Sequence, residues 1–273
     1  MILKTIQPKL PLQPYIDSIW IFESDFGVPT TSSRVVVPNG KAKIIIPYKN
    51  ALFANRQTSS EEREEGKIHF VGLWDESVVI SSYTSETGTI GIELTPKGAY
   101  RFLRLSLHEL TNQIHTFDEV YKKEGENLQN LIAETSDVFS KVECIQQFLL
   151  NKLIASDQHN TIVDFVTDAI IKNKGLITIK ELEKKTGYSK RYLSLLFNDY
   201  IGVSPKTFSA IIRFQEFYKL WAIYPDSEFY KSELYHFYYD QSHFIKEFKR
   251  FSGYAPKKYA DMDNEFGRIF YKR

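Results

Sequence analysis

Hydrophobic residues alternate with polar ones over the first hundred positions of the chain and recur at helical spacing beyond them. The runs SRVVVPNGKAKIIIPYKN (33–50), GKIHFVGLW (66–74), SVVISSYTS (77–85) and GTIGIELTP (88–96) are short and rich in β-branched residues, as strands are. The Pro-Asn-Gly turn inside the first run predicts a hairpin. The acidic run SSEEREEG (59–66) is expected to be a solvated hairpin loop.

Helical periodicity starts at Lys97. The stretch KGAYRFLRLSLHELTNQ (97–113) and most of residues 126–156 place apolar residues near a spacing of 3.6, which predicts helices. The polar segment SDQHN (156–160) then marks a domain boundary. After it the pattern predicts helices and essentially no strands, beginning with an amphipathic helix over 161–173.

Residues 176–202 carry the signals of a helix, a tight turn and a second helix. Thr178 is suited to cap the first helix, and Glu181 three residues later completes a capping box. Gly187 is suited to end that helix in a left-handed turn, and Ser189 is suited to cap the next one. This order of elements is the helix-turn-helix arrangement, which helical hairpins without DNA function also share.

The predicted helix after Ser189 has an apolar inner side and a mixed outer side. The inner residues are Leu193, Leu196, Phe197 and Tyr200, and the outer residues are Arg191, Leu195 and Asn198. A longer helix follows over 204–223, with Ser204 as cap and Pro205 in its first turn. About 18 residues give a rod of about 27 Å, close to the ~34 Å between successive major-groove faces of DNA.

The stretch YYDQSHFIKEFKRFSGYAPKKY (238–259) shows the same two-sided pattern. Its helix begins after Asp240 and ends near Gly253 and Pro256. On a helical wheel the aromatic residues Phe244, Phe248 and Phe251 form a core stripe. The opposite side carries Ser242, Lys246, Lys249 and Arg250. The polar and basic residues interleaved with the aromatics therefore make an outer face.

The composition narrows the class of protein. A single cysteine, Cys144, excludes an intramolecular disulfide and a cysteine-built zinc site. There is no signal-peptide pattern and no 18-residue apolar run, so a soluble, cytoplasmic protein is expected. Residues 160–273 hold 19 Lys and Arg against 14 Asp and Glu, whereas residues 1–159 hold 16 against 20. The basic C-terminal part is compatible with a polyanionic partner, although so modest a surplus also arises by chance.

The motifs of residues 187–215 and 238–259 resemble the two helix-turn-helix units of the AraC/XylS family of transcription regulators. The resemblance implies a two-lobed domain of seven helices that binds double-stranded DNA, works as a homodimer and contacts RNA polymerase. It implies no cofactor, metal or membrane partner. By position, the implied base readers are Lys190, Arg191, Ser194, Leu195, Gln241, Ser242 and Lys246, and the implied phosphate partners are His243 and Lys249.

Some positions depart from this family or allow two interpretations. The turn of the second unit usually carries a glycine where Phe237 stands, and Ser232 and Glu233 replace residues that are normally small or apolar. We therefore expect a distorted or weakly reading second lobe, with specificity residing in the first. Leu195 suits contact with thymine methyl groups, and equally an ordinary exposed leucine or contact with the other domain. A merely solvated face is the alternative for Lys246 and Lys249.

The N-terminal half is similar, more weakly, to the β-rich, cupin-related sensor domain that precedes many such regulators. The six histidines are scattered, without the His-x-His spacing that a cupin metal site needs. Aromatic residues are candidates for lining an effector pocket, although ordinary core packing explains each of them as well. They are Trp20, Phe22, Tyr48, Trp74 and Tyr83.

The sequence therefore predicts an α+β chain of two domains. Residues 1–157 form a β-rich, cupin-like sensor and dimerisation domain with trailing helices, 160–262 form the double helix-turn-helix domain, and 263–273 form a tail. The predicted function is sequence-specific regulation of transcription, under the control of an effector in the first domain. An alkyl-transfer repair enzyme is disfavoured because it needs an activated cysteine and a four-cysteine zinc site, and no catalytic pattern is evident. A protein-interaction module with a decayed second unit and weak DNA binding remains the alternative.

Overall fold

The computed structural model describes most of the chain. The described residues are 2–26, 35–50, 52–55, 60–62, 66–81, 84, 86–103, 105–155, 159–223, 235–262 and 264. The predicted effector residue Tyr83, the departures at Ser232 and Glu233, and all but Asn264 of the predicted tail lie outside them.

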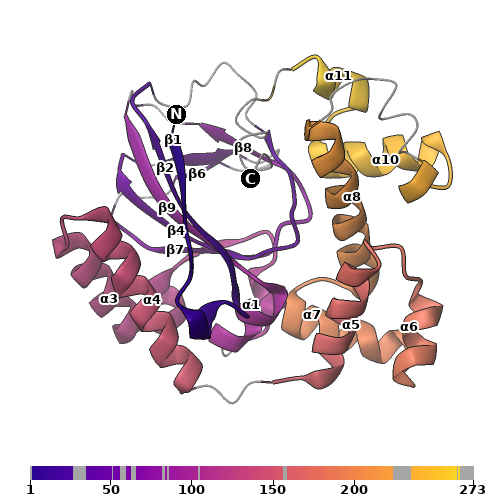
Figure 1. Cartoon of the computed structure of the whole chain (residues 1–273), viewed down its shortest axis with the longest axis horizontal. Coiled ribbons are helices and arrows are strands. Elements are labelled where there is room, and N and C mark those ends of the chain that lie inside the picture. Colours follow the sequence, from indigo (N-terminus) through magenta and orange to yellow (C-terminus); the bar gives the residue numbers. More distant parts are fainter. Residues whose placement is uncertain are drawn as a thin grey trace.

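Two antiparallel sheets build the first part of the molecule (Figure 1). The larger sheet has the order β1-β2-β9-β4-β7-β10 and the smaller sheet has the order β3-β8-β5-β6. The strands are β1 (Ile2–Ile6), β2 (Ile16–Ser24), β3 (Val35–Val36), β4 (Lys43–Lys49), β5 (Phe53–Asn55), β6 (Ser60–Glu62), β7 (His69–Val71), β8 (Val78–Ser81), β9 (Thr87–Leu94) and β10 (Ile114–Thr116). The short β-rich runs of the sequence are thus confirmed as strands.

The predicted hairpin around Pro-Asn-Gly is wrong. β3 pairs with β8 in the smaller sheet, whereas β4 pairs with β7 and β9 in the larger one. The turn at Gly40 carries the chain from one sheet to the other, and a β-carbon at Gly40 would lie 3.3 Å from the side chains of Phe208 and Ile212 on a distant helix. The acidic run is also not wholly a loop, since Ser60–Glu62 forms strand β6 against β5.

Short helices connect and cover the sheets. They are η1 (Leu10–Leu12), α1 (Pro96–Phe102), η2 (Leu107–Leu110), α2 (Phe117–Tyr121), α3 (Lys123–Glu134) and α4 (Val138–Ile154). The continuous helix predicted for 97–113 is wrong: α1 ends at Phe102, and its C-cap Leu103 has extended backbone and is almost fully buried. Burying Leu103 and then Leu107 on the sheet redirects the chain. The helical prediction for 126–156 is confirmed, with a break where Asp137 caps α4.

Over the residues that the structure describes, the second part consists of helices and the turns that connect them, without strands. Its helices are α5 (Thr161–Lys172), α6 (Ile179–Thr186), α7 (Lys190–Ile201), α8 (Pro205–Ile223), α10 (Gln241–Ser252) and α11 (Pro256–Ala260), and residues 235–237 are helical as well. The expected fold class, a β-rich part followed by a helical part, is confirmed. The exact division into domains stays a prediction.

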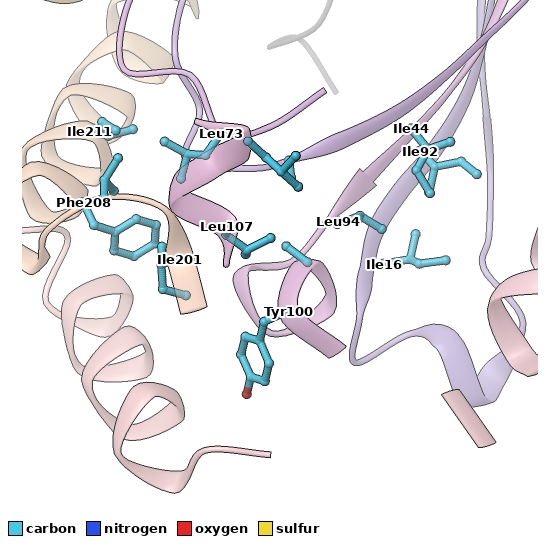
Figure 2. Close-up of a cluster of buried hydrophobic side chains, with 14 of the residues drawn as sticks. Ile16, Ile44, Leu73, Ile92, Leu94, Tyr100, Leu107, Ile201, Phe208 and Ile211 are labelled. Carbon is cyan, nitrogen blue, oxygen red and sulfur yellow. The ribbon is translucent and has the colours of Figure 1, made fainter. Parts of the chain in front are cut away.

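The core continues from the sheets into the helical part. In Figure 2 the buried side chains run from Ile44, Ile92 and Leu94 of the larger sheet, past Leu107 and Tyr100, to Ile201, Phe208 and Ile211 of the helices. The rings of Tyr100 and Tyr200 meet edge to face across this boundary, with centroids 5.4 Å apart. Because burial of apolar surface is the main favourable term in folding, the two parts stabilise each other.

A second, smaller core cluster lies between the two sheets. It contains Trp20, Phe22, Ile45, Leu52, Ala54, Val71, Val78 and Ile80. The Trp20 ring reaches across β9 at Gly91, where the β-carbon of any other residue would lie only 2.0 Å from the indole. Glycine at this position therefore makes room for the tryptophan.

Candidate nucleic-acid interface and ligand cavity

The first helix-turn-helix unit is built from α6 and α7, and its predicted caps are confirmed. The Thr178 hydroxyl accepts a hydrogen bond from the Glu181 backbone N–H, and the Glu181 carboxylate accepts one from the Thr178 N–H at 2.8 Å. The Thr178 hydroxyl also donates to this carboxylate, at 2.7 Å, and this bond first and the backbone N–H second lower the pKa of the Glu181 carboxyl. Gly187 has a φ of 75°, the left-handed conformation of a helix C-cap, and Ser189 caps α7.

Helix α7 has the two sides that its sequence predicts. Leu193 and Phe197 are buried, and Leu196 and Tyr200 pack against the same core. Among the predicted base readers, Lys190 and Arg191 are exposed, Ser194 is half-buried and Leu195 is 61% exposed. Leu195 is not buried against the other part of the molecule, so its exposure fits a surface kept for a partner.

Two tyrosines extend the exposed surface of α7. Tyr188 and Tyr192 are 41% and 42% exposed, and their ring centroids lie 4.9 Å apart. Together with Leu195 they give the first unit an apolar and aromatic outer side around Arg191.

The second unit ends in α10, whose sides also match the prediction. Asp240 caps the helix by accepting a hydrogen bond from the His243 N–H at 2.7 Å. Phe244, Phe248 and Phe251 are fully buried. The predicted DNA-contacting residues of this helix are all exposed: Gln241, Ser242, His243, Lys246 and Lys249.

Phe237 occupies the turn position where the family usually has glycine. Its backbone is helical rather than left-handed, so glycine is not required there. The side chain is 8% exposed and meets Phe217 of α8 edge to face. Phe237 therefore adds to the core under α10, and the cap of α10 is intact behind it.

A buried ion pair fixes α10 to α8. Both guanidinium nitrogens of Arg213 that face Glu247 donate to its carboxylate, at 3.2 and 2.5 Å. The neighbouring Tyr238 hydroxyl is buried next to Glu247, and burial first and this carboxylate second raise the pKa of Tyr238. A two-point pair of this kind sets both the distance and the rotation of α10 on α8.

The C-terminal ends of α7 and α10 are held by the β-rich part. The Thr111 hydroxyl donates to the carbonyl oxygen of Gly202, the C-cap of α7, at 2.7 Å. Arg250, in the last turn of α10, forms an ion pair with Asp75 at 2.9 Å. The N-terminal turns of both helices stay exposed. The sequence predicts that Arg250 lies on the outer face of its helix, but it does not predict this ion pair. Its partner Asp75 is 175 positions away, and no local pattern connects the two.

A cavity of about 840 Å³ lies between the β-rich part and the helices α5 and α8. Of the predicted effector residues, Trp20, Phe22 and Trp74 line it. Tyr48 does not; its hydroxyl donates to Glu23 at 2.8 Å, and burial with this carboxylate raises its pKa. Sequence reasoning missed the helical wall, formed by Thr167, Asp168, Ile171, Ile212, Gln215, Glu216 and Lys219.

The polar residues on the β side of the cavity form one network. Lys41 pairs with Asp17 at 2.5 Å and with Glu93 at 3.2 Å, and Asn39 donates to Glu93 at 3.0 Å. Burial alone lowers the pKa of Lys41, but its attraction to Glu93 and Asp17 outweighs this and leaves the pKa raised. Lys41 is therefore held as a cation by its neighbours.

The described residues show neither a metal site nor a membrane-spanning helix. In the described part of the chain, no group of His, Cys, Asp and Glu is arranged to hold a metal ion. Over the same residues, no helix has the length and apolar character needed to cross a membrane.

Comparisons with known proteins give one family model and several structures. The family described as "Domain of unknown function (DUF6597)" matches residues 4–116, which span the two sheets. Curated protein sequences gave no match. ToxT from Vibrio cholerae with a bound unsaturated fatty acid is 11% identical, with a TM-score of 0.47 over 94% of this chain and 97% of that chain.

Two more solved structures are similar over much of their length. ToxT bound to (E)-4-(8-methylnaphthalen-1-yl)but-3-enoic acid is 12% identical, with a TM-score of 0.49 over 89% of this chain and 98% of that chain. The AraC-like transcriptional activator CuxR is 11% identical, with a TM-score of 0.27 over 73% of this chain and 82% of that chain. At these TM-scores, function has to be argued from the side chains of this chain.

Proposed function

We propose that the chain is a sequence-specific DNA-binding transcription regulator that inserts α7 and α10 into successive segments of the major groove. A molecule bound in the cavity controls this activity. The proposal assigns no enzymatic role. Homodimer formation and contact with RNA polymerase belong to it as expectations from the family resemblance.

The observation that carries the proposal is the way in which the two helices are presented. Each is capped, has its aromatic or aliphatic side buried, and is held at its C-terminal end, at Gly202 or Arg250. Each leaves its N-terminal turn exposed. In helix-turn-helix proteins the N-terminal residues of the recognition helix contact base edges, so this is the end that has to be free.

The exposed residues supply both kinds of DNA contact. Arg191 is suited to pair with guanine O6 and N7, and Gln241 with adenine N6 and N7. Leu195 is suited to pack against thymine methyl groups. Lys190, Ser194, Ser242 and Lys246 complete the proposed base-reading set, and His243 and Lys249 are proposed to contact phosphates.

The helix α8 supports the spacing of the two units. It has 19 residues, which corresponds to about 28 Å of helix, and it packs against both α7 and α10. The cavity is lined by the same helix. A ligand there contacts the element that joins the two units, which supports control of DNA binding from the cavity.

Selection from a random-sequence DNA pool by the full-length protein tests this function. Bound DNA is enriched over several rounds, with salt titrations of the final pool. We expect a motif with two half-sites about one helical turn apart. A single short half-site would mean that the second unit does not read bases. No enrichment at any salt concentration would favour the protein-interaction module instead.

A further inference from the structure

The cavity between the two parts has an apolar floor. Phe22, Leu52, Val71 and Ile80 line it and are each almost fully buried. Trp20 and Trp74 add two indole rings, and Val36 adds a half-buried side chain from the smaller sheet. A volume of about 840 Å³ is in the range of pockets that enclose drug-sized molecules, ~300–1,000 Å³.

The charged residues that line the cavity already have partners. Lys41 bridges Asp17 and Glu93, Lys97 pairs with Asp168 at 2.8 Å, and Lys219 pairs with Glu216 at 3.0 Å. The remaining charged residue, Lys43, donates to Asn39 at 3.1 Å, and the Asn39 amide donates in turn to Glu93. Among the described lining residues, four lysines thus balance four carboxylates.

This balance decides which ligands the cavity accepts. An ionised group that leaves water needs a compensating charge, and here an ion pair would have to open, or Lys43 would have to leave Asn39, to supply it. In either case a carboxylate on the ligand would give the described lining five negative charges against four positive ones, in a partly buried site. An uncharged ligand that buries apolar surface against the floor makes no such demand.

From the apolar floor and the balanced charges of the lining residues, we infer that the ligand is an uncharged, largely apolar molecule. Its size would be about two or three fused or linked rings. It would pack on the floor and reach the face of α5 and α8 that lines the cavity. The inference deepens the proposed function, since its regulatory meaning rests on that function, but binding itself can be measured without DNA.

A matched pair of fluorescent probes tests the ligand class. Prodan is an uncharged naphthyl ketone, and the naphthoic acid with the same dimethylamino group carries a carboxylate at neutral pH in place of the ketone. Each is titrated into the full-length protein, and the change in emission gives a dissociation constant. We expect saturable binding of Prodan at one site, about tenfold or more tighter than that of the acid, together with a higher melting temperature.

A pair of valine variants tests the location. Val36→Phe places a larger side chain in the cavity, whereas Val79→Phe makes the same change on the smaller sheet at a residue that does not line it. We expect at least tenfold weaker Prodan binding for Val36→Phe and unchanged binding for Val79→Phe. The melting temperature of each free variant shows whether it has folded.

Three results would overturn the inference. The acid binding as tightly as Prodan would mean that the cavity accepts a charged ligand. No saturable binding of either probe would mean that it is not an apolar ligand site. Equal binding by a folded Val36→Phe variant would place the ligand elsewhere. None of these results depends on DNA, and a failed DNA selection would leave them unaffected.

Discussion

The two helix-turn-helix units are alike in their caps and different in what they expose. Ser189 and Asp240 cap helices of 12 residues each, and Gly202 and Gly253 end them in left-handed backbone. Helix α7 and the turn before it expose Tyr188, Tyr192 and Leu195 beside two cations, Lys190 and Arg191. Helix α10 exposes three cations, Lys246, Lys249 and Arg250, beside polar Gln241 and Ser242. Its exposed apolar residues are Ile245, at 38%, and Tyr239 before its cap, at 92%.

This difference suggests a division of labour on DNA. Apolar groups and a guanidinium discriminate between base edges, because methyl groups and paired acceptors differ from one base pair to the next. Clustered cations attract every phosphate alike and give salt-dependent affinity. We therefore expect the first unit to supply most of the sequence specificity and the second to supply most of the electrostatic affinity.

The largest expected effect is a loss of stability when the ion pair that holds α10 on α8 is broken. Arg213→Ala leaves the Glu247 carboxylate, which is only 9% exposed, without its cation. The expected cost is about 3 kcal/mol of the free energy of unfolding, measured by urea denaturation. The paired variant Arg213→Leu with Glu247→Leu removes both charges and should recover most of the loss. A parent-like denaturation midpoint for Arg213→Ala alone would show that the pair does not hold α10.

A smaller loss is expected from the first reading helix. Arg191→Ala should cost about 1–3 kcal/mol on the selected DNA and relax the preference at one base pair. Fluorescence anisotropy with a panel of single-base variants of the site measures both effects. Lys184→Ala, an exposed cation on α6, is the control. Unchanged binding to the selected site would mean that Arg191 does not face the bases.

Leu195 allows a test of an apolar contact with DNA, in which no charge is changed. Leu195→Ala should weaken binding about fourfold, close to the ~0.8 kcal/mol of one buried methylene group. Replacing the contacted thymine by deoxyuridine removes the methyl group and should give the same loss. The two changes combined should cost no more than one of them. Fully additive losses would mean that Leu195 does not contact the thymine methyl group.

Lys249 should behave as a general contact. Lys249→Ala is expected to weaken all DNA sequences about threefold and to reduce the salt dependence of binding by about one unit. Titrations at several salt concentrations, on selected and on scrambled DNA, give both quantities. A salt dependence equal to that of the parent would reject the phosphate contact.

The smallest effect is expected at the contact between α10 and the β-rich part. Asp75→Asn removes the charge opposite Arg250 but keeps the oxygen that Asn112 contacts. Freed from this partly exposed pair, Arg250 becomes available to DNA, and affinity should rise about twofold. Arg250→Ala should cancel the gain in the double variant. A gain that persists without Arg250 would point to a different cause.

Local signals in the sequence predicted the parts of the fold that depend on neighbouring residues. The caps at Thr178, Ser189 and Asp240 involve bonds within three positions, so their patterns were sufficient. The stripe of phenylalanines on α10 could be predicted for the same reason, because the spacing of residues within one helix determines which of them share a side.

Pairings between distant segments could not be predicted in this way. The Pro-Asn-Gly turn is typical of a hairpin, but β3 is matched to β8 and β4 to β9 by packing of the whole core. The ion pair between Asp75 and Arg250 and the helical wall of the cavity depend on the docking of two parts far apart in sequence. Three of the aromatic residues predicted for a pocket do line it: Trp20 and Phe22 of β2 and Trp74 after β7. Large apolar rings within a β-rich segment point to its interior.

The most direct test of the division between the two units is a DNA selection run in parallel with three proteins. The three proteins are the parent, a double variant with Arg191→Ala and Leu195→Ala, and a second double variant with His243→Ala and Lys249→Ala, the two proposed phosphate contacts. Each is presented with the same random pool at the same salt concentration. We predict that the first double variant enriches a motif with one half-site degraded. The second double variant should enrich the parent's motif with lower yield and weaker salt dependence. Loss of the motif in the second double variant and its retention in the first would contradict the account.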